Sequence, residues 1–219
     1  MVSFGHAAFF GIGAYVVGIL TFHHSSAEPL WSLIPGSDQM LITIPVAMLV
    51  AGFAALIIGA LSLRTSGVQF IMITLAFAQL VFFFFISLTG YGGEDGIIMR
   101  RTNELFGLNM RNRITVYFVL LGFAVPFFLI LWRLIHSSFG AVVTGIRQNE
   151  RRLAAMGIAP YRYKLLAFVL SGMGAGLAGA LEANLLRFAS PDMMHWVKSG
   201  DLIIIIILGG VGTFYGPII

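Results

Sequence analysis

The sequence predicts an all-α membrane protein, a polytopic bundle of about six transmembrane helices. Hydrophobic residues make up 58% of the 219 residues and charged residues only 10%, whereas soluble domains are about 45–50% apolar and about 25% charged. Because so few charges cannot cover a globular surface, lipid must contact much of the chain. Lipid forces every backbone amide to be satisfied internally, and this favours helices over open sheets.

Six apolar runs define the predicted spans. Each is close to the roughly 20 residues that cross a hydrocarbon core of about 30 Å. The runs cover residues 4–22, 41–63, 67–88, 114–135, 165–186 and 202–219. Nearly all polar residues lie in the linkers between them, so residues 1–219 are predicted to form a single transmembrane domain.

The distribution of Lys and Arg gives only a weak orientation. If the linker 23–39 lies outside, the seven basic residues inside are Arg64, Arg133, Arg147, Arg151, Arg152, Arg162 and Lys164. The six outside are Arg100, Arg101, Arg111, Arg113, Arg187 and Lys198. Basic residues are enriched on the cytoplasmic side of membrane proteins, but an excess of one does not decide the orientation.

Small residues form a face on two of the predicted spans. Helices in lipid associate through such faces, because the surrounding lipid provides no hydrophobic drive for association. The face of the first span consists of Ala7, Gly11, Ala14 and Gly18, and that of the fifth span of Gly172, Gly176, Gly179 and Ala183. Both spans are therefore predicted to be interior. The third span ends in "VFFFFI" (81–86) and is predicted to face lipid there.

Gly174-x-Gly176-x-x-Gly179 has the spacing of a dinucleotide-binding loop. That loop requires a strand before it, a helix after it, and an acid at the end of the next strand. Here the glycines lie inside one unbroken apolar run, and Asp201 precedes the next apolar run instead of following it. The glycines therefore predict helix packing, and the sequence predicts no cofactor.

Other kinds of chemistry find no support in the sequence. The chain has no cysteine, which excludes disulfides, thiolate metal sites and thiol catalysis. His23 and His24 are adjacent and point apart, so no metal site is predicted. Ser171, His195 and Asp201 form no recognisable catalytic pattern, so no enzyme is predicted. The basic residues sit at the ends of apolar runs and form no groove for nucleic acid.

Four polar residues inside the spans are candidates for a transport pathway, because polar groups in lipid are costly. They are His6, Thr74, Gln79 and Glu182. Each also has a structural alternative: Glu182 and His6 can lie at the interfaces, and Thr74 and Gln79 can bond across helices.

The linker 136–164 is predicted to contain a short helix that begins after Asn149. Asn149 is a suitable N-cap, Gly157 can close the helix, and Pro160 blocks its continuation. The residues assigned to the helix and its caps are Asn149, Glu150, Arg151, Arg152, Leu153, Ala154, Met156 and Gly157. Two helical turns are not stable alone in water, so the helix packs either on its own membrane domain or on another subunit.

Six blocks follow one another along the chain: "SFGHAAFFGIGAY" (3–15), "GVQFIMITLAFAQLV" (67–81), "TGYGGEDGI" (89–97), "FGAVVTGIRQNERRLAAMGI" (139–158), "YRYKLLAFVLSGMGAGLAGAL" (161–181) and "LGGVGTFYGP" (208–217). Together they resemble the LivM-type permeases of branched-chain amino acid ABC transporters. The resemblance implies that the linker 136–164 is cytoplasmic and that its helix is a coupling helix. Leu153 and Met156 would fill an apolar cleft of an ATPase, and Arg151 and Arg152 would pair with acidic ATPase residues.

The resemblance also implies a location and partners. It implies a multi-pass protein of the bacterial inner membrane that carries leucine, isoleucine and valine, with cytoplasmic ATPase subunits, a sister permease subunit and a periplasmic binding protein. It further implies a transport subunit and no enzyme, with ATP hydrolysis on the separate ATPase subunits, and no part of this chain resembles a Walker A loop that could bind ATP. Related permeases carry urea, amides or simple sugars. A secondary transporter is the remaining alternative, although paired intramembrane carboxylates for ion coupling are scarce.

Two departures from the family pattern are visible. Members of the family carry helices before the first block and more chain after the last, so the chain is expected to be incomplete at both ends. The general importer pattern also places Glu six residues before Gly, whereas Glu150 lies seven before Gly157.

Overall fold

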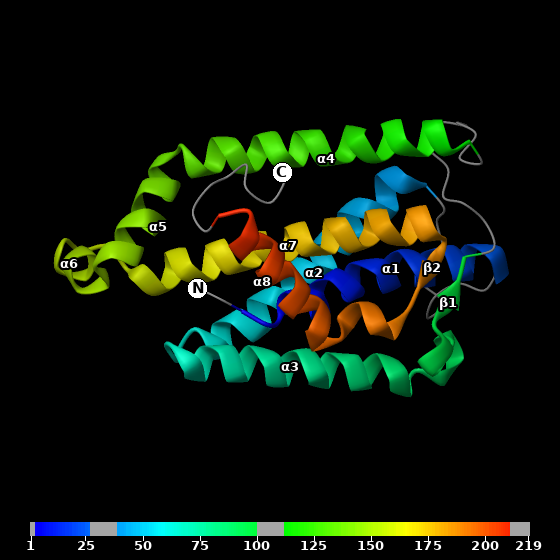
Figure 1. The fold of residues 1–219 in the computed structure, drawn as a ribbon, viewed down its shortest axis with the longest axis horizontal. Coiled ribbons are helices and arrows are strands. Elements are labelled where there is room, and N and C mark those ends of the chain that lie inside the picture. Colours follow the sequence, from blue (N-terminus) through cyan, green and yellow to red (C-terminus); the bar gives the residue numbers. More distant parts are fainter. Residues whose placement is uncertain (1–2, 27–38, 100–111, 211–219) are drawn as a thin grey trace.

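Five long helices dominate the computed structural model, which describes residues 3–26, 39–99 and 112–210 (Figure 1). They are α1 (His6–Ser26), α2 (Met40–Ser62), α3 (Val68–Ser87), α4 (Arg113–Ile135) and α7 (Pro160–Leu186). Each is long and apolar enough to cross a membrane, and the predicted all-α bundle is confirmed. The sixth predicted run, 202–219, begins within the shorter helix α8 (Trp196–Leu208) and continues into residues outside the described part of the chain.

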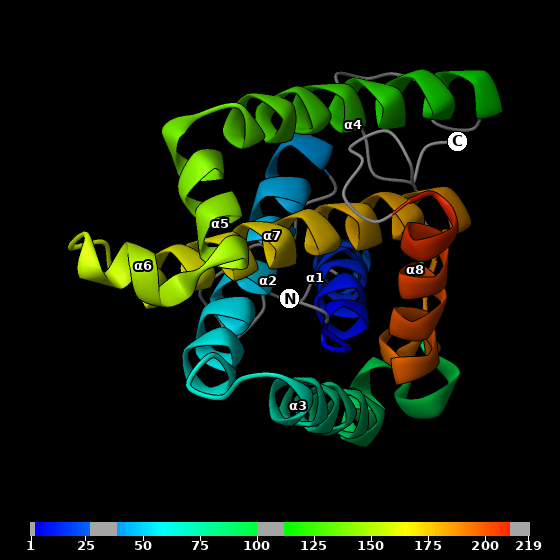
Figure 2. The same ribbon diagram turned by 60° about the vertical axis from the view of Figure 1, so that its left-hand side comes forward.

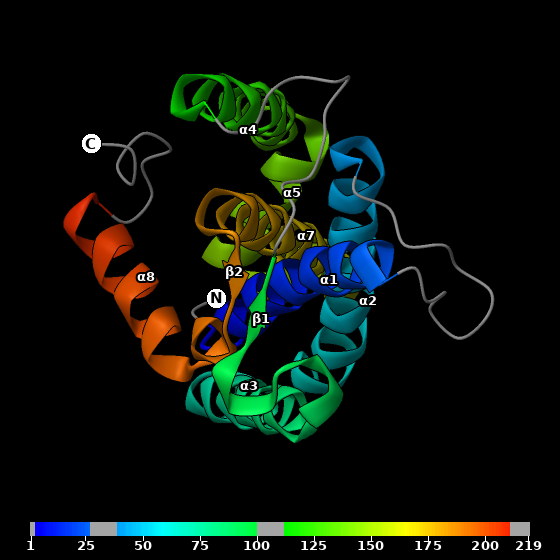
Figure 3. The same cartoon turned by 90° about the vertical axis from the view of Figure 1, so that its right-hand side faces the viewer.

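α1, α2 and α7 form the centre of the bundle, and α3 and α4 lie on opposite sides of it (Figures 1 and 3). Buried side chains such as Phe9, Ala51 and Phe168 cluster between the three central helices. α4 exposes most of its apolar side chains, and the last turns of α3 expose Phe83 and Phe84. Exposed apolar surfaces of this kind are suited to contact with lipid.

The small-residue face of α7 packs closely on α2. A Cβ atom added at Gly172 would overlap the Cβ of Ala55, and one added at Gly176 would overlap the Cβ of Ala51. Ala183, further along the same face, is fully buried. Helix backbones approach this closely only where both surfaces are small, which is how helices associate in lipid.

α7 also packs on α1, here through direct backbone contacts. A Cβ atom at Gly179 would overlap the carbonyl oxygen of Phe10, and one at Gly13 would overlap the carbonyl oxygen of Gly176. The glycine of α1 that meets α7 is therefore Gly13, which does not belong to the face predicted on this helix.

The predicted face of α1 packs on a different part of the chain. Its residues are all buried: Ala7, Gly11, Ala14 and Gly18. Gly11 lies against Met194, and Gly18 lies against Ala189. Both partners belong to residues 187–199, called the returning segment below. α1 is thus enclosed by α7 on one side and by the returning segment on another.

The returning segment corrects the prediction that residues 187–200 form an outer linker. Arg187 has a left-handed backbone conformation (φ 57°) at the end of α7. The chain then passes through β2 (Phe188–Ala189) and the 3-10 helix η3 (Pro191–Met194) into α8. Because the small residues of α1 leave room beside that helix, these residues run back along it into the bundle.

Ser199 fixes the far end of the returning segment. Its Oγ accepts a hydrogen bond from the backbone N–H of Ala7 (3.0 Å) and donates one to the carbonyl of Phe4 (2.7 Å). A serine from α8 thereby satisfies an amide at the N-terminus of α1 that has no partner within the helix. Lys198, counted above as outside, consequently lies at the end of the bundle where α1 begins.

A small antiparallel ribbon closes the opposite end of the bundle. β1 (Ile97–Ile98) pairs with β2, with Ile97 opposite Ala189. Two 3-10 turns, η1 (Thr89–Tyr91) and η2 (Gly93–Asp95), precede it. Gly96 has φ 77°, and a Cβ there would overlap the carbonyl oxygen of Ala189, so only glycine fits this position.

Candidate coupling helix and intramembrane polar residues

Two short helices project from one end of the bundle between α4 and α7 (Figures 1 and 2). α5 (Ser138–Gln148) and α6 (Glu150–Ala155) occupy most of the linker 136–164. Only α6 is predicted above from the sequence. Phe139, Val143 and Ile146 recur at the spacing of one helical face, and this is the signal that would have revealed α5.

The two residues expected at the ends of α6 set its length. Oδ1 of Asn149 accepts a hydrogen bond from the backbone N–H of Arg152 (3.1 Å), an N-cap. At the other end, Gly157 adopts φ +84°. Its N–H bonds to the carbonyl of Ala154 (3.0 Å), and the N–H of Ile158 bonds to that of Leu153 (3.2 Å). This pair of bonds is a Schellman motif, which requires a left-handed residue.

Replacement of Gly157 by alanine is expected to loosen α6. A left-handed backbone costs an L-residue about 1–2 kcal/mol, and free energies of that size change an opening equilibrium by roughly 5–30-fold. Hydrogen exchange of the amides of Gly157 and Ile158 should accelerate by that factor. Gly90→Ala is the control, because Gly90 has open space around it and no positive φ. Equal exchange in both variants would contradict this account of the helix end.

α6 is attached to its own chain by one ion pair and one apolar contact. The Glu150 carboxylate pairs with the ammonium group of Lys164 near the start of α7. Leu153 packs against α5, with its Cδ1 3.0 Å from the position that a Cβ of Gly145 would take. Leu153 therefore serves contacts within the chain, although the sequence analysis assigns it with Met156 to an ATPase cleft. That assignment stays a prediction.

The outer surface of α6 is apolar at one point and basic around it. The Met156 side chain is 73% exposed, and the side chains of Arg151 and Arg152 are exposed beside it. Glu150 is the only acidic residue in segments 64–67 and 133–164, and it is paired with Lys164. An apolar tip inside a basic surface fits a partner with an apolar pocket and an acidic rim.

His6, one of the four predicted pathway residues, contacts α7. Its Nε2 lies 2.8 Å from Oγ of Ser171, and its ring packs edge-on against Phe9 and Phe168. Ser171 also lines an apolar cavity of about 420 Å³ between α4, α5 and α7. The sequence does not reveal Ser171 as a partner of His6, because the two lie 165 residues apart in the chain.

The other three predicted pathway residues do not join His6. Thr74 is buried and donates a hydrogen bond to the carbonyl of Ile71 (2.9 Å) within α3, a packing role. Gln79 is half-buried on the same helix, and Glu182 is half-buried near the other end of α7. Since a helix rises about 1.5 Å per residue, Glu182 lies well over 10 Å along α7 from Ser171. The four residues do not form one site.

The sequence profile described as "Branched-chain amino acid transport system / permease component" matches residues 1–219. The chain belongs to this permease family. The permease is similar to the high-affinity branched-chain amino acid permease proteins LivM of Escherichia coli (strain K12) and of Salmonella typhimurium (strain LT2). With each it shares 26% identity over 243 residues, which cover 100% of this chain and 54% of the relative.

A third relative is a sugar permease. The permease is 33% identical over 103 residues to the ribose import permease protein RbsC of Bacillus subtilis (strain 168), across 42% of this chain and 32% of the relative. No solved structure matches the permease. The permease spans about half the length of the LivM proteins. Membership of the family and five apolar helices make it a multi-pass membrane protein of a transport system.

Proposed function

We propose that this chain is a membrane-spanning subunit of an ATP-driven importer, and that it translocates leucine, isoleucine and valine across the bacterial cytoplasmic membrane. The family match over residues 1–219 carries the proposal. The similarity to LivM along the whole chain supports branched-chain amino acids as the cargo. The partners are cytoplasmic ATPase subunits, a sister permease subunit and a periplasmic binding protein.

In this proposal α6 is the element that docks on an ATPase subunit. The exposed Met156 would enter an apolar pocket of the ATPase, and Arg151 and Arg152 would pair with acids on its rim. With Lys198 at the end where α1 begins, this end holds eight of the basic residues in the described part of the chain, against Arg113 and Arg187 at the other. This clearer bias supports a cytoplasmic position for α6.

Movement of α6 would reach the centre of the bundle through α7. Glu150 joins α6 to Lys164 of α7, and the hydroxyl of Tyr161 donates a hydrogen bond to the carbonyl of Ala60 in α2 (2.9 Å). α7 is packed without gaps against α1 and α2 at its glycine face. Because close-packed helices move as a unit, displacement of α6 would shift the three central helices together.

A sugar is the second candidate for the cargo. The similarity to the ribose permease RbsC favours it, although that similarity covers 42% of the chain. The similarity to the LivM proteins covers the whole chain and therefore favours an amino acid over a sugar.

Stimulation of ATP hydrolysis by loaded binding protein distinguishes the two candidate cargoes. The permease would be reconstituted with its ATPase and sister subunits in lipid nanodiscs, and binding protein loaded with leucine, ribose or urea would be added. We expect leucine-loaded binding protein to raise the rate of ATP hydrolysis and the other two to leave it unchanged. Stimulation by the ribose-loaded protein alone would establish the sugar alternative and overturn the amino-acid proposal.

A further inference from the structure

Tyr15 is a buried polar residue in the middle of a candidate membrane span. It is the middle residue of the span His6–His24, and its side chain is fully buried. Within the described part of the chain, its hydroxyl has no hydrogen-bond partner. A buried hydroxyl without a partner loses its interaction with water and gains nothing in return, so such a group calls for an explanation.

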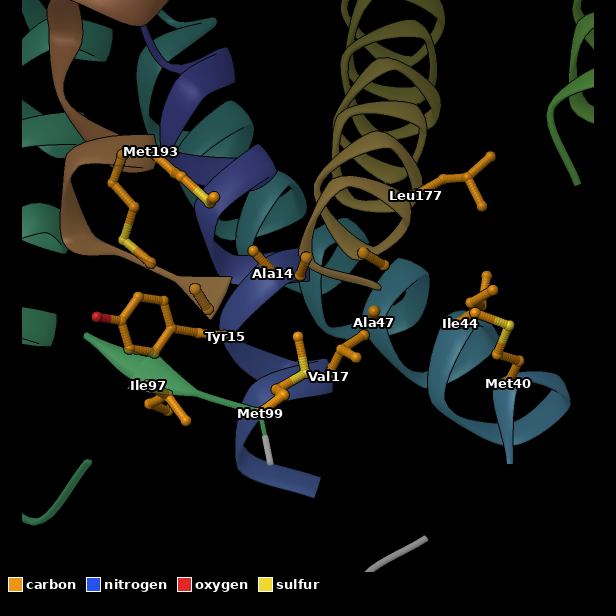
Figure 4. Close-up of a cluster of buried hydrophobic side chains, with 14 of the residues drawn as sticks. Ala14, Tyr15, Val17, Met40, Ile44, Ala47, Ile97, Met99, Leu177 and Met193 are labelled. Carbon is orange, nitrogen blue, oxygen red and sulfur yellow. The ribbon is translucent and has the colours of Figure 1, made fainter. Parts of the chain in front are cut away.

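The Tyr15 ring points away from α7, toward the returning segment. Figure 4 shows it projecting from α1 beside Met193 and Ile97, on the side opposite Leu177. The ring of Phe85 from α3 packs on it with a centroid distance of 4.7 Å. The hydroxyl is therefore directed into a region bounded by α1, α3, β1 and η3.

Asp192 brings a negative charge to the same region. It belongs to η3, and its neighbour Met193 packs in the same buried cluster as Tyr15. The backbone N–H of Asp192 is held by Oγ of Ser190 (3.2 Å). The side chain is exposed, and in the described part of the chain it makes no ion pair. The carboxylate therefore has no positive partner supplied by this part of the molecule.

This charge lies at mid-depth of the bundle. Asp192 is located between Ala189, which lies against Gly18, and Met194, which lies against Gly11. Gly11 and Gly18 flank Tyr15 on α1. A carboxylate at this depth is costly in lipid and marks a pathway for polar cargo. The backbone around it is extended or 3-10, and such backbone occurs at membrane depth only where it is buried in protein or lines an aqueous path.

We propose that Tyr15 and Asp192 form the contact of the translocation path with the ammonium group of an amino acid. The carboxylate pairs with the positive charge of the cargo, and the Tyr15 hydroxyl accepts a hydrogen bond from it. Met193 shares the buried cluster of Tyr15, and Phe82 and Phe85 pack against that cluster, so the apolar surface beside Tyr15 suits an aliphatic side chain. This inference rests on the proposed function and names the residues that select its cargo.

Access to the Tyr15 hydroxyl requires α3 to move. In this conformation Tyr15 is enclosed, and Phe85 of α3 covers its ring. The buried residues of α3 are Phe70, Thr74 and Ala78, and no residue of α3 beyond Ala78 is fully buried. Movement of the end of α3 that carries Phe85 away from η3 would uncover Tyr15 and open the path on that side.

Uptake of radiolabelled leucine by the complete reconstituted transporter tests the pair. Tyr15→Phe and Asp192→Asn should each lower the uptake rate about tenfold or more, the factor expected for losing one hydrogen bond to a charged group. Tyr117→Phe and Asp201→Asn are matched controls, because Tyr117 is exposed on α4 and Asp201 is exposed on α8. Both controls should keep the wild-type rate.

The outcomes separate this inference from the proposed function. If wild type imports leucine and both Tyr15→Phe and Asp192→Asn import it at the wild-type rate, the inference is overturned and the function stands. If wild type imports no leucine in the presence of ATP, the proposed function fails and the inference fails with it.

Cysteine labelling tests the same pair without any transport measurement. Because the chain has no cysteine, Asp192→Cys introduces one thiol on an otherwise unreactive chain. A charged, membrane-impermeant thiol reagent should label Asp192→Cys, leucine should slow the labelling, and Ile130→Cys on the exposed face of α4 should stay unlabelled. Failure of the reagent to reach Asp192→Cys both with and without ATP would show that no aqueous path passes this residue and would overturn the inference.

Discussion

Replacement of Gly179 by alanine is expected to separate α7 from α1 and to destabilise the membrane domain. The added Cβ would occupy the position of the Phe10 carbonyl oxygen. Overpacking in a core costs about 1–3 kcal/mol when side chains can adjust, and a backbone carbonyl cannot rotate away. We therefore expect a loss at the upper end of this range or beyond, about 3 kcal/mol or more. Thermal unfolding of the purified chain in detergent measures this loss of stability.

Gly122 provides the matched control for this substitution. It is also a glycine within a long membrane helix, but nothing lies within 4 Å of a Cβ added there. Gly122→Ala should leave stability unchanged or raise it by up to about 1 kcal/mol, because alanine is the better helix former. If Gly179→Ala unfolds at the same temperature as Gly122→Ala, α7 and α1 do not pack as described.

Reversal of the charges of Arg151 and Arg152 is expected to abolish transport-coupled ATP hydrolysis. Both side chains are exposed on α6, so glutamates at these positions do not disturb packing within the chain. They would instead face acidic groups on the ATPase, and like charges across an interface cost several kcal/mol. The double variant Arg151→Glu/Arg152→Glu should insert normally into the membrane, and leucine-loaded binding protein should no longer stimulate its ATP hydrolysis.

Arg133→Glu serves as the control for added negative charge at the same end of the bundle. Arg133 is exposed in the last turn of α4 and lies outside α6, so its reversal should preserve stimulation. Normal coupling in the α6 double reversal would rule out docking through α6. Loss of coupling in all variants alike would point to a general effect of charge on insertion.

The helices and the capped ends of α6 follow from local rules, and the sequence is sufficient to predict them. Apolar runs of membrane length predict the five long helices, because lipid leaves the backbone no alternative. Asn149 marks the start of α6 because its side chain caps the helix. Gly157 marks the end because a left-handed backbone is needed there. The close packing of α7 follows from the repeat of Gly172, Gly176 and Gly179, because only small residues allow that approach.

The features that the sequence does not reveal depend on contacts between distant parts of the chain. The polar stretch at 187–199 has the composition of a linker. Its path becomes clear only in the structure, where Met194 packs on Gly11 and Ala189 packs on Gly18 of α1. Gly13 meets the backbone of Gly176 in α7, a contact between distant parts of the chain that no periodicity in α1 encodes. The same holds for the buried Tyr15. Its hydroxyl becomes a candidate for binding cargo only because the returning segment places Asp192 on the same side of α1.

ATP-dependent uptake of leucine into proteoliposomes tests the central claim most directly. Vesicles would contain the permease with its sister and ATPase subunits, with ATP enclosed and leucine-loaded binding protein outside. The account predicts accumulation of leucine that requires hydrolysable ATP and persists when ion gradients are collapsed. Accumulation that continues without ATP and stops when a proton or sodium gradient is removed would identify a secondary transporter and contradict the account.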